Sequence, residues 1–227
     1  MKKKSSLTQS PTYQSRIRIG FQSDKDIWKQ APAIYNHHTL KILGHPVMED
    51  WERPYMKQLA RIATRKGGAI LEVGFGMGIS SGFIQESEIA SHTIIEANHT
   101  VAEQAYLFAR HTRVPTAIIE GFWEEGIDDI PSGSIDGILF DTYPLSEREI
   151  HKNHFAFFPH AHRLLKKDGI FTYYSDEPET FSQEHFQRLI AAGFEREHIS
   201  GCVVPVQPPA DCLYWHNKTL LAPQVTK

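Results

Sequence analysis

The sequence lacks several features that define other classes of protein. It has only two cysteines, Cys202 and Cys212, in 227 residues, which is too few for a disulfide framework, and we expect both thiols to be free in a reducing compartment. It has no run of the roughly 18 to 20 apolar residues that span a bilayer. Its basic start is followed by polar residues where a signal peptide has an apolar segment. These absences predict a cytoplasmic protein that does not insert into a membrane.

The chain also lacks an excess of positive charge. Its 24 lysines and arginines stand against 27 aspartates and glutamates, for a net charge of −3, so no overall basic field attracts nucleic acid or anionic lipid. We therefore expect a small-molecule partner. The 41% hydrophobic content of the chain is enough for one sizeable core. We predict a flexible arm over residues 1–26, a single domain over residues 27–227, and a monomer or homodimer.

Short β-rich runs alternate with helical ones in the middle of the chain. This alternation predicts an α/β fold whose sheet is mostly parallel, with helices on both faces. A separate apolar pattern from Pro46 onward predicts a helix that ends before Gly67-Gly68. Two runs after Gly193 predict a C-terminal β-hairpin, which completes seven strands. The predicted strands are residues 69–73, 93–96, 116–119, 135–141, 169–174, 199–206 and 212–216, and the predicted helices are residues 79–87, 99–110, 147–165 and 182–192.

The most informative motif is the stretch Leu71–Gly78, a strand that runs into three alternate glycines. Glycines at these positions let the backbone approach a ligand closely and turn into a helix. A dinucleotide fingerprint would have the pattern G-x-G-x-x-G. Here the third glycine, Gly78, comes one residue early, and Glu72 precedes the loop. The spacing disfavours NAD and is similar to the motif of class I methyltransferases that cradles the amino acid part of S-adenosylmethionine.

Acidic and aromatic residues follow the next predicted strands. Glu96 ends the second strand, where a carboxylate can accept both hydroxyls of a ribose. Gly121 and Phe122 follow the third strand, and Phe122 or Trp123 could stack on adenine. Asp141 ends the fourth strand. Because ligands of open α/β sheets bind at the carboxyl edge, these residues predict one nucleotide-containing site.

Four segments resemble the guanidinoacetate methyltransferase family. They are residues Ile42–Met56, Leu71–Gly78, Asp136–Leu145 and Pro208–Cys212. The likeness runs from about Trp28 to the C-terminus. It implies the Rossmann-like class I methyltransferase fold, S-adenosylmethionine as cofactor and a small guanidino substrate, with guanidinoacetate, the precursor of creatine, as the first candidate.

The resemblance also implies site residues. Glu52 and Asp141 would clamp the guanidinium of the substrate, with Tyr143 beside the reacting group. Met48 would also meet the substrate, and the backbone at Phe171-Thr172 would meet its carboxylate. The residues implied for the cofactor site are Trp28, Met48, Met56, Glu72, Gly74, Phe75, Gly76, Met77, Gly78, Glu96, Gly121, Phe122 and Asp141.

A physical argument supports the two carboxylates independently. A sulfonium and a guanidinium in one pocket repel each other and lose hydration, so the site needs negative charge. A guanidinium is also a poor nucleophile, and a hydrogen-bonded carboxylate would localise electron density on one nitrogen and accept the released proton. Asp141 is the first choice as that base.

Several alternatives remain open at this stage. The link after Tyr174–Pro178 is shorter than in the family, which could admit a longer guanidine such as arginine. A non-catalytic module that binds S-adenosylmethionine and an NAD-dependent oxidoreductase are further possibilities. The 13 histidines form no set with cysteines or carboxylates that is typical of a metal site, so we expect no metal.

Overall fold

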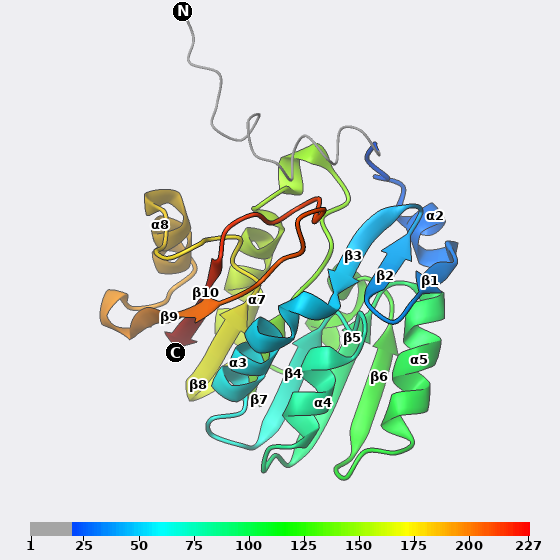
Figure 1. The fold of residues 1–227 in the computed structure, drawn as a ribbon. Coiled ribbons are helices and arrows are strands. Elements are labelled where there is room, and N and C mark those ends of the chain that lie inside the picture. Colours follow the sequence, from blue (N-terminus) through cyan, green and yellow to red (C-terminus); the bar gives the residue numbers. More distant parts are fainter. Residues whose placement is uncertain (1–19) are drawn as a thin grey trace, which may run out of the picture.

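The computed structural model describes residues 20–227, whose centre is a seven-stranded sheet with the strand order β6-β5-β4-β7-β8-β10-β9 (Figure 1). The first five strands in this order are parallel, and β10 pairs antiparallel with both of its neighbours. The predicted mostly parallel sheet with a C-terminal hairpin is confirmed. The strands are β4 (Ala69–Val73), β5 (Ser91–Glu96), β6 (Thr116–Glu120), β7 (Ile135–Phe140), β8 (Leu165–Tyr173), β9 (Ile199–Pro205) and β10 (Thr219–Thr226).

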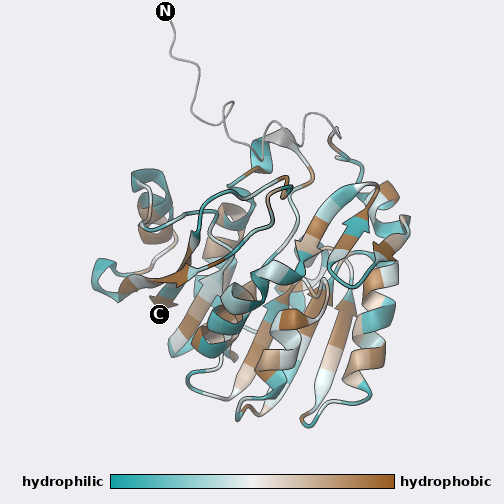
Figure 2. Ribbon diagram, viewed as in Figure 1, coloured by the Kyte–Doolittle hydropathy of each residue, from teal (hydrophilic) through white to brown (hydrophobic). Residues whose placement is uncertain are grey.

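Helices cover both faces of this sheet, as the alternating pattern predicted. Figure 1 shows α3 (Arg53–Ala63), α4 (Ile79–Gln85) and α5 (His99–Ala109) in front of it and α7 (Phe158–Leu164) behind. The central strands are buried on both sides, so neighbouring residues belong to different cores: Ile70 packs with the front helices and Leu71 with α7. Figure 2 shows this apolar character along the strands. The remaining helical segments are α6 (Trp123–Gly126), α8 (Gln183–Ala191), η3 (Ile127–Asp129), η4 (Glu147–Glu149), η5 (Asn153–Phe157) and η6 (Arg196–His198).

A second, three-stranded sheet was not predicted. It contains β1 (Ala33–Tyr35), β2 (Thr39–Ile42) and β3 (His45–Glu49), follows α2 (Lys25–Gln30), and lies above the carboxyl ends of β4 to β6 in Figure 1. The prediction of a helix from Pro46 onward was therefore wrong at its start. Met48 pairs with Leu40 across the strands. The helix α3 begins after η2 (Asp50–Glu52) and carries Pro54 in its first turn, where the missing N–H of proline costs nothing.

The C-terminal hairpin has a different second strand from the predicted one. β9 pairs with β10 along its whole length, from Pro205 opposite Thr219 to Ile199 opposite Val225. The segment 212–216 instead belongs to the connection between these strands, because the buried side chains of Cys212 and Trp215 pack against the core on the α3 side. Both cysteines are free thiols, as predicted.

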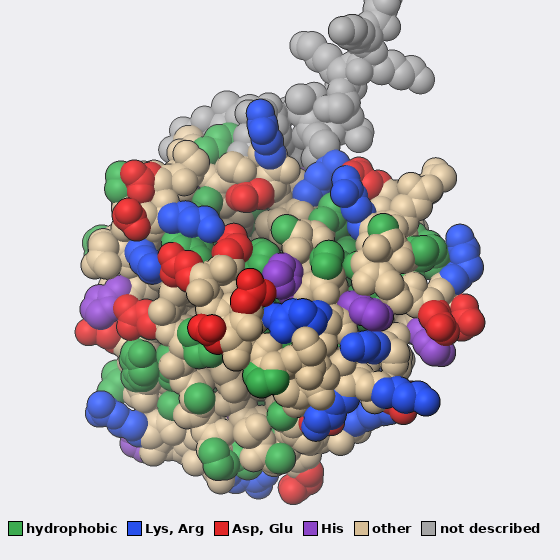
Figure 3. All heavy atoms as spheres, turned by 180° about the vertical axis from the view of Figure 1, so that it is seen from behind, with side chains coloured by type: hydrophobic (Ala, Val, Ile, Leu, Met, Phe, Trp, Pro, Cys, Tyr) green, Lys and Arg blue, Asp and Glu red, His purple; other side chains and the backbone are tan. Residues whose placement is uncertain are grey.

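The predicted helix over residues 147–165 is interrupted. It consists of η4, η5 and α7, and His151 between the first two has a φ of +61°, which an α-helix does not allow. The predicted arm over residues 1–26 lies outside the described residues up to residue 19, and its last two residues are already in α2. Within residues 20–227, no helix has the length and apolar character to cross a bilayer. Acidic and basic side chains are interspersed on the face seen in Figure 3.

Candidate active site

The carboxyl ends of four parallel strands bring the predicted residues to one edge of the sheet. Backbone hydrogen bonds continue just beyond the strands: the N–H of Gly74 donates to Ile95 and the N–H of Asp141 donates to Val73, each at 2.8 Å. The N–H of Gly121 donates to Glu96, also at 2.8 Å. The loops after β4, β5, β6 and β7 therefore start side by side, and they bring residues that are far apart in the sequence to the same edge of the sheet.

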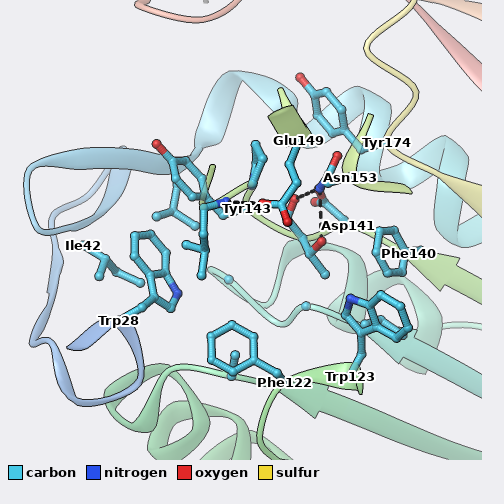
Figure 4. A pocket seen from close by; sticks show the side chains of 18 of the residues that line it. Trp28, Ile42, Phe122, Trp123, Phe140, Asp141, Tyr143, Glu149, Asn153 and Tyr174 are labelled. Atoms are coloured by element: carbon cyan, nitrogen blue, oxygen red, sulfur yellow. Dashed lines mark hydrogen bonds between the residues drawn. The ribbon is translucent and has the colours of Figure 1, made fainter. Parts of the chain in front are cut away.

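A pocket opens at this edge (Figure 4). The small sheet and α2 contribute to its lining along with the loops after the parallel strands. The figure shows Trp28, Phe122 and Trp123 along its sides and Asp141 between them. The predicted residues that line the pocket are Trp28, Met48, Glu52, Gly74, Gly76, Glu96, Gly121, Phe122, Asp141 and Tyr143.

The glycine loop approaches its neighbours too closely for larger residues. At Gly74, which has a φ of +95°, an added Cβ would lie 1.8 Å from the carbonyl oxygen of Asp141. At Gly76, with a φ of +55°, it would lie 3.0 Å from Sδ of Met48. The N–H of Met77 donates to the same sulfur at 3.3 Å. Gly74 thus allows the backbone after β4 to pack closely against the backbone after β7. Gly76 leaves its own backbone accessible from the pocket.

Glu96 holds the glycine loop and lines the pocket at the same time. Its Oε2 accepts the N–H of Phe75 at 2.9 Å, and its Oε1 accepts the N–H of Asn98 at 2.8 Å. Burial raises the pKa of its carboxyl above the usual value, and the backbone N–H donors oppose this rise. Its side chain lies at the end of β5 and lines the pocket, at the position where the sequence predicted an acceptor for the ribose.

Glu52 and Asp141 form an acidic pair in this pocket. Glu52 is 3% exposed. Burial raises its pKa to about 8, the charge of Asp141 adds to the rise, and a hydrogen bond from Tyr214 opposes it. Burial also raises the pKa of Asp141 to about 7, and the negative charges of Asp176, Glu72 and Glu96 add to this rise. A cationic ligand would reverse both shifts, because it favours the ionised carboxylates.

Two stacked aromatic rings line the same pocket as the glycine loop. The rings of Trp28 and Tyr143 stack with centroids 5.0 Å apart and planes 12° apart. The side-chain amide of Asn98 donates to the carbonyl oxygens of Trp28 and Ala31, both at 2.8 Å. This buried asparagine therefore fixes the end of α2 beside the strand that ends in Glu96. The sequence analysis had not identified Asn98.

Four residues predicted for the cofactor lie beside the pocket rather than in its lining. Glu72 is fully buried, accepts a hydrogen bond from Ser81, and lies 3.0 Å from Nε2 of His92. Its side chain supports the fold behind the loop. The other three belong to the glycine loop or the turn into α4, and they are Phe75, Met77 and Gly78.

Three further predicted residues lie within the cores. Met56 is fully buried on α3. The ring of Phe171 packs between Tyr173 and Phe194, with centroid distances of 4.7 and 6.2 Å. The hydroxyl of Thr172 donates to Pro223 at 2.6 Å. The structure does not bring these residues into the lining of the pocket.

The lining includes residues that the sequence analysis did not propose. Tyr214 donates to Oε1 of Glu52, and Asp176 lies 3.3 Å from Nδ1 of His151. Tyr214 comes from the connection between β9 and β10, which had been expected to be a strand. His151 and Asp176 both have a positive φ, which no local sequence pattern specified. Further lining residues that were not predicted include Glu149, Asn153 and Tyr174.

Comparison with known families classifies the chain. A family model described as guanidinoacetate N-methyltransferase matches residues 19–227. The chain belongs to this family. Relatives include proteins called protein arginine N-methyltransferase 2. The one from Candida glabrata is 29% identical over 70% of this chain and 41% of its own length, and the one from Emericella nidulans is 36% identical over 42% and 22%. The chain thus spans about two fifths of the length of these relatives, or less.

Solved structures support the fold of this guanidinoacetate N-methyltransferase family member. A spermidine synthase in complex with the transition state analogue AdoDATO superposes with a TM-score of 0.62 and 13% identity, covering 86% of this chain and 72% of the other. A SAM dependent methyltransferase from Archaeoglobus fulgidus gives a TM-score of 0.52 and 11% identity, covering 77% and 94%. Identities this low show the fold alone.

The family and the fold imply S-adenosylmethionine as the cofactor, and the pocket fits it. The backbone of Gly76 borders the pocket because glycine has no side chain there, and an added side chain would meet Met48. Glu96 lines the same pocket at the end of β5, and Phe122 lies near the end of β6. These residues would hold the amino acid part, the ribose and the adenine, respectively. Within residues 20–227 there is no cluster of three or more histidine, cysteine or acidic side chains arranged for a metal ion.

Proposed function

We propose that this protein transfers a methyl group from S-adenosylmethionine to a guanidino nitrogen of a small, amino-acid-like substrate. The observation that carries the proposal is the pair of carboxylates, buried Glu52 and half-buried Asp141, in the pocket that the glycine loop and Glu96 also line. A bound cation favours the ionised form of an acidic pair whose pKa values are raised. A planar guanidinium offers several N–H donors to such a pair.

Glu52 and Asp141 have different proposed roles in the reaction. Bound S-adenosylmethionine supplies an electrophilic methyl group. Glu52 orients the guanidinium, because its Oε1 is already fixed by Tyr214 at 2.5 Å and by the N–H of Glu49 at 2.9 Å. Asp141 accepts the proton that leaves the attacking nitrogen. The stacked rings of Trp28 and Tyr143 exclude water from one side of the site.

Two substrates fit this proposal. Guanidinoacetate, which would give creatine, is favoured by the family description. The alternative is arginine or a related guanidino metabolite, and the relatives, whose name refers to arginine in proteins, support a guanidino group of the arginine type. The cytoplasmic location, the monomer or homodimer state and the flexible arm over residues 1–26 stay predictions.

A substrate panel tests the proposal. The purified protein is incubated with S-adenosylmethionine and guanidinoacetate, arginine or another guanidine, and the products are identified by mass and by the position of the added methyl group. We expect a methylated guanidine and S-adenosylhomocysteine in equal amounts. Binding of S-adenosylhomocysteine without methylation of any guanidine would instead favour the non-catalytic module.

A further inference from the structure

Asn98 is a fully buried residue behind the cofactor end of the pocket, two residues after Glu96. Its backbone N–H donates to Oε1 of Glu96 at 2.8 Å. Its side-chain oxygen accepts the N–H of Val101 at 3.1 Å, which makes Asn98 the N-cap of α5. These two contacts are local, and they fix the chain where β5 turns into α5.

The side-chain amide of Asn98 makes a second, long-range set of contacts. It donates to the carbonyl oxygens of Trp28 and Ala31, both at 2.8 Å, at the C-terminal end of α2. The last carbonyl groups of a helix have no partner within the helix. An N-cap requires only a side-chain oxygen, which serine, threonine or aspartate also provides. The amide group of Asn98 is therefore needed by α2 and not by α5.

The position of α2 depends on contacts of this kind, because the helix has only six residues and helices this short are unstable in isolation. Two ion pairs also join α2 to the domain, Lys25 with Glu124 at 3.0 Å and Lys29 with Glu125 at 2.9 Å. Their side chains are between 27% and 51% exposed, and ion pairs at the surface contribute little. The buried hydrogen bonds from Asn98 are better placed to fix this helix.

Trp28 connects the position of α2 to the cofactor site. Its side chain is 4% exposed, lines the pocket and stacks on Tyr143. Figure 4 shows its ring among the side chains of the pocket. Through Asn98, the backbone that carries this ring is joined to Glu96, which lines the same pocket.

We propose that Asn98 is a positioning residue for S-adenosylmethionine, because its side-chain amide holds Trp28 against the bound cofactor. Since Asn98 is fully buried, it acts through Trp28 and not by its own contact with the ligand. The inference concerns the cofactor, so it does not depend on the identity of the methyl acceptor.

Asn98→Asp tests the two amide hydrogen bonds. Aspartate keeps the size of the side chain and the cap of α5, but its carboxylate cannot donate to the two carbonyl groups. We expect the Kd for S-adenosylhomocysteine, measured by calorimetry, to rise at least about tenfold. Asn36→Asp is the matched control, because the exposed side chain of Asn36 accepts the N–H groups of His38 and Thr39, and aspartate can do the same. An unchanged Kd in folded Asn98→Asp would overturn the proposal.

A double-mutant cycle with Trp28 separates positioning from a general effect on the fold. Asn98→Ser is the second variant, since serine also caps a helix but adds no charge and lacks the amide. Trp28→Ala should itself weaken binding of S-adenosylhomocysteine. In the Trp28→Ala background, either substitution of Asn98 should raise the Kd less than about threefold, because the ring that Asn98 holds is absent.

Two results of this cycle would contradict the proposal. One is unchanged affinity in Trp28→Ala, and the other is the same loss of affinity for the Asn98 variants in both backgrounds, which would mean that Asn98 acts through Glu96 or through the fold. The measurement uses no methyl acceptor, so its outcome is separate from the test of the guanidine assignment.

Discussion

Tyr214 donates a hydrogen bond of 2.5 Å to Oε1 of Glu52, which precedes it by 162 residues. The same oxygen accepts the N–H of Glu49 at 2.9 Å. Within the part of the chain that the structure describes, no hydrogen bond to Oε2 of Glu52 is found. The connection between β9 and β10 thus orients an acid at the start of α3, with one oxygen fixed and the other left for a ligand.

Tyr214→Phe tests this orientation. The variant removes one of two donors to Oε1, and because the hydrogen bond from Tyr214 lowers the pKa of Glu52, its loss should raise that pKa further. We expect KM for the guanidine to rise by a factor of roughly 5 to 30, from a loss of about 1 to 2 kcal/mol, with a smaller change in kcat. Kinetics between pH 7 and 9 would measure both effects. Tyr106→Phe, at an exposed position on α5, is the control. An unchanged KM and pH profile would exclude a role for Tyr214 in orienting Glu52.

Glu96→Ala tests the cofactor site. The variant deletes an acceptor for the ribose hydroxyls and also leaves the N–H groups of Phe75 and Asn98 without their partner. We expect binding of S-adenosylhomocysteine to weaken by about 1 to 3 kcal/mol, measured by calorimetry. Glu120→Ala at the end of β6 is the comparison, because Glu120 does not line the pocket. Equal affinity in the wild type and in folded Glu96→Ala would exclude a role for Glu96 in binding.

The parallel sheet was predictable from the sequence because its strands are encoded locally. Residues 69–73 form a mostly apolar run before glycines, and β4 has these bounds. The small sheet was missed since its strands are short and have exposed positions. The apolar spacing from Met48 to Ile62 fits a helix, yet Met48 pairs with Leu40 in a sheet. The pairing of β3 with β2 therefore determined the structure at Met48, although the spacing of apolar residues fits a helix.

The candidate site was also predictable only in part. Glu52 and Asp141 were identified from segments that resemble a family, and both line the pocket. Tyr214 and Asp176 were missed because they act through contacts with distant residues. Their positions depend on how the β9–β10 connection and the end of β8 pack against α3 and β7. Neither feature has a local sequence signal.

The pH dependence of stability tests the raised pKa of Asp141. A carboxyl whose folded pKa is raised stabilises the fold most below its unfolded pKa, and this contribution is lost as pH rises through the folded pKa. For Asp141 the interval runs from its usual value of 3.8 to about 7. Asparagine cannot ionise, so Asp141→Asn should become more stable relative to the wild type as pH rises from 5 to 8.5. We expect about 2 kcal/mol, or roughly 4 to 8 °C in Tm.

Thermal unfolding of the ligand-free proteins at several pH values measures this difference. Asp211→Asn, at an exposed position in the β9–β10 connection, should show a nearly constant difference from the wild type. If the Asp141→Asn difference is equally constant, Asp141 is ionised throughout this range and the proposed electrostatics of the pocket are wrong.

Asp141→Asn also tests the base itself. The substitution preserves the shape of the side chain but removes its charge and its ability to accept a proton. General-base catalysis contributes typically about 10²- to 10⁴-fold, so we expect turnover to fall at least a hundredfold. Single-turnover methyl transfer with both ligands saturating measures the chemical step, and circular dichroism checks the fold.

Glu52→Gln is the matched comparison, because the two acids share the pocket but have different proposed roles. This variant loses the charge that faces the guanidinium, so a larger share of its defect should appear as weaker substrate binding, and saturation should restore part of the rate. Asp141→Asn should not be restored by saturation, because its defect lies in the transfer step. Affinity for S-adenosylhomocysteine should change less than turnover in both variants. Near-normal transfer by Asp141→Asn would refute its role as base, and near-normal transfer by both variants would refute the guanidine assignment, since neither carboxylate would then be needed to hold a second cation beside the sulfonium.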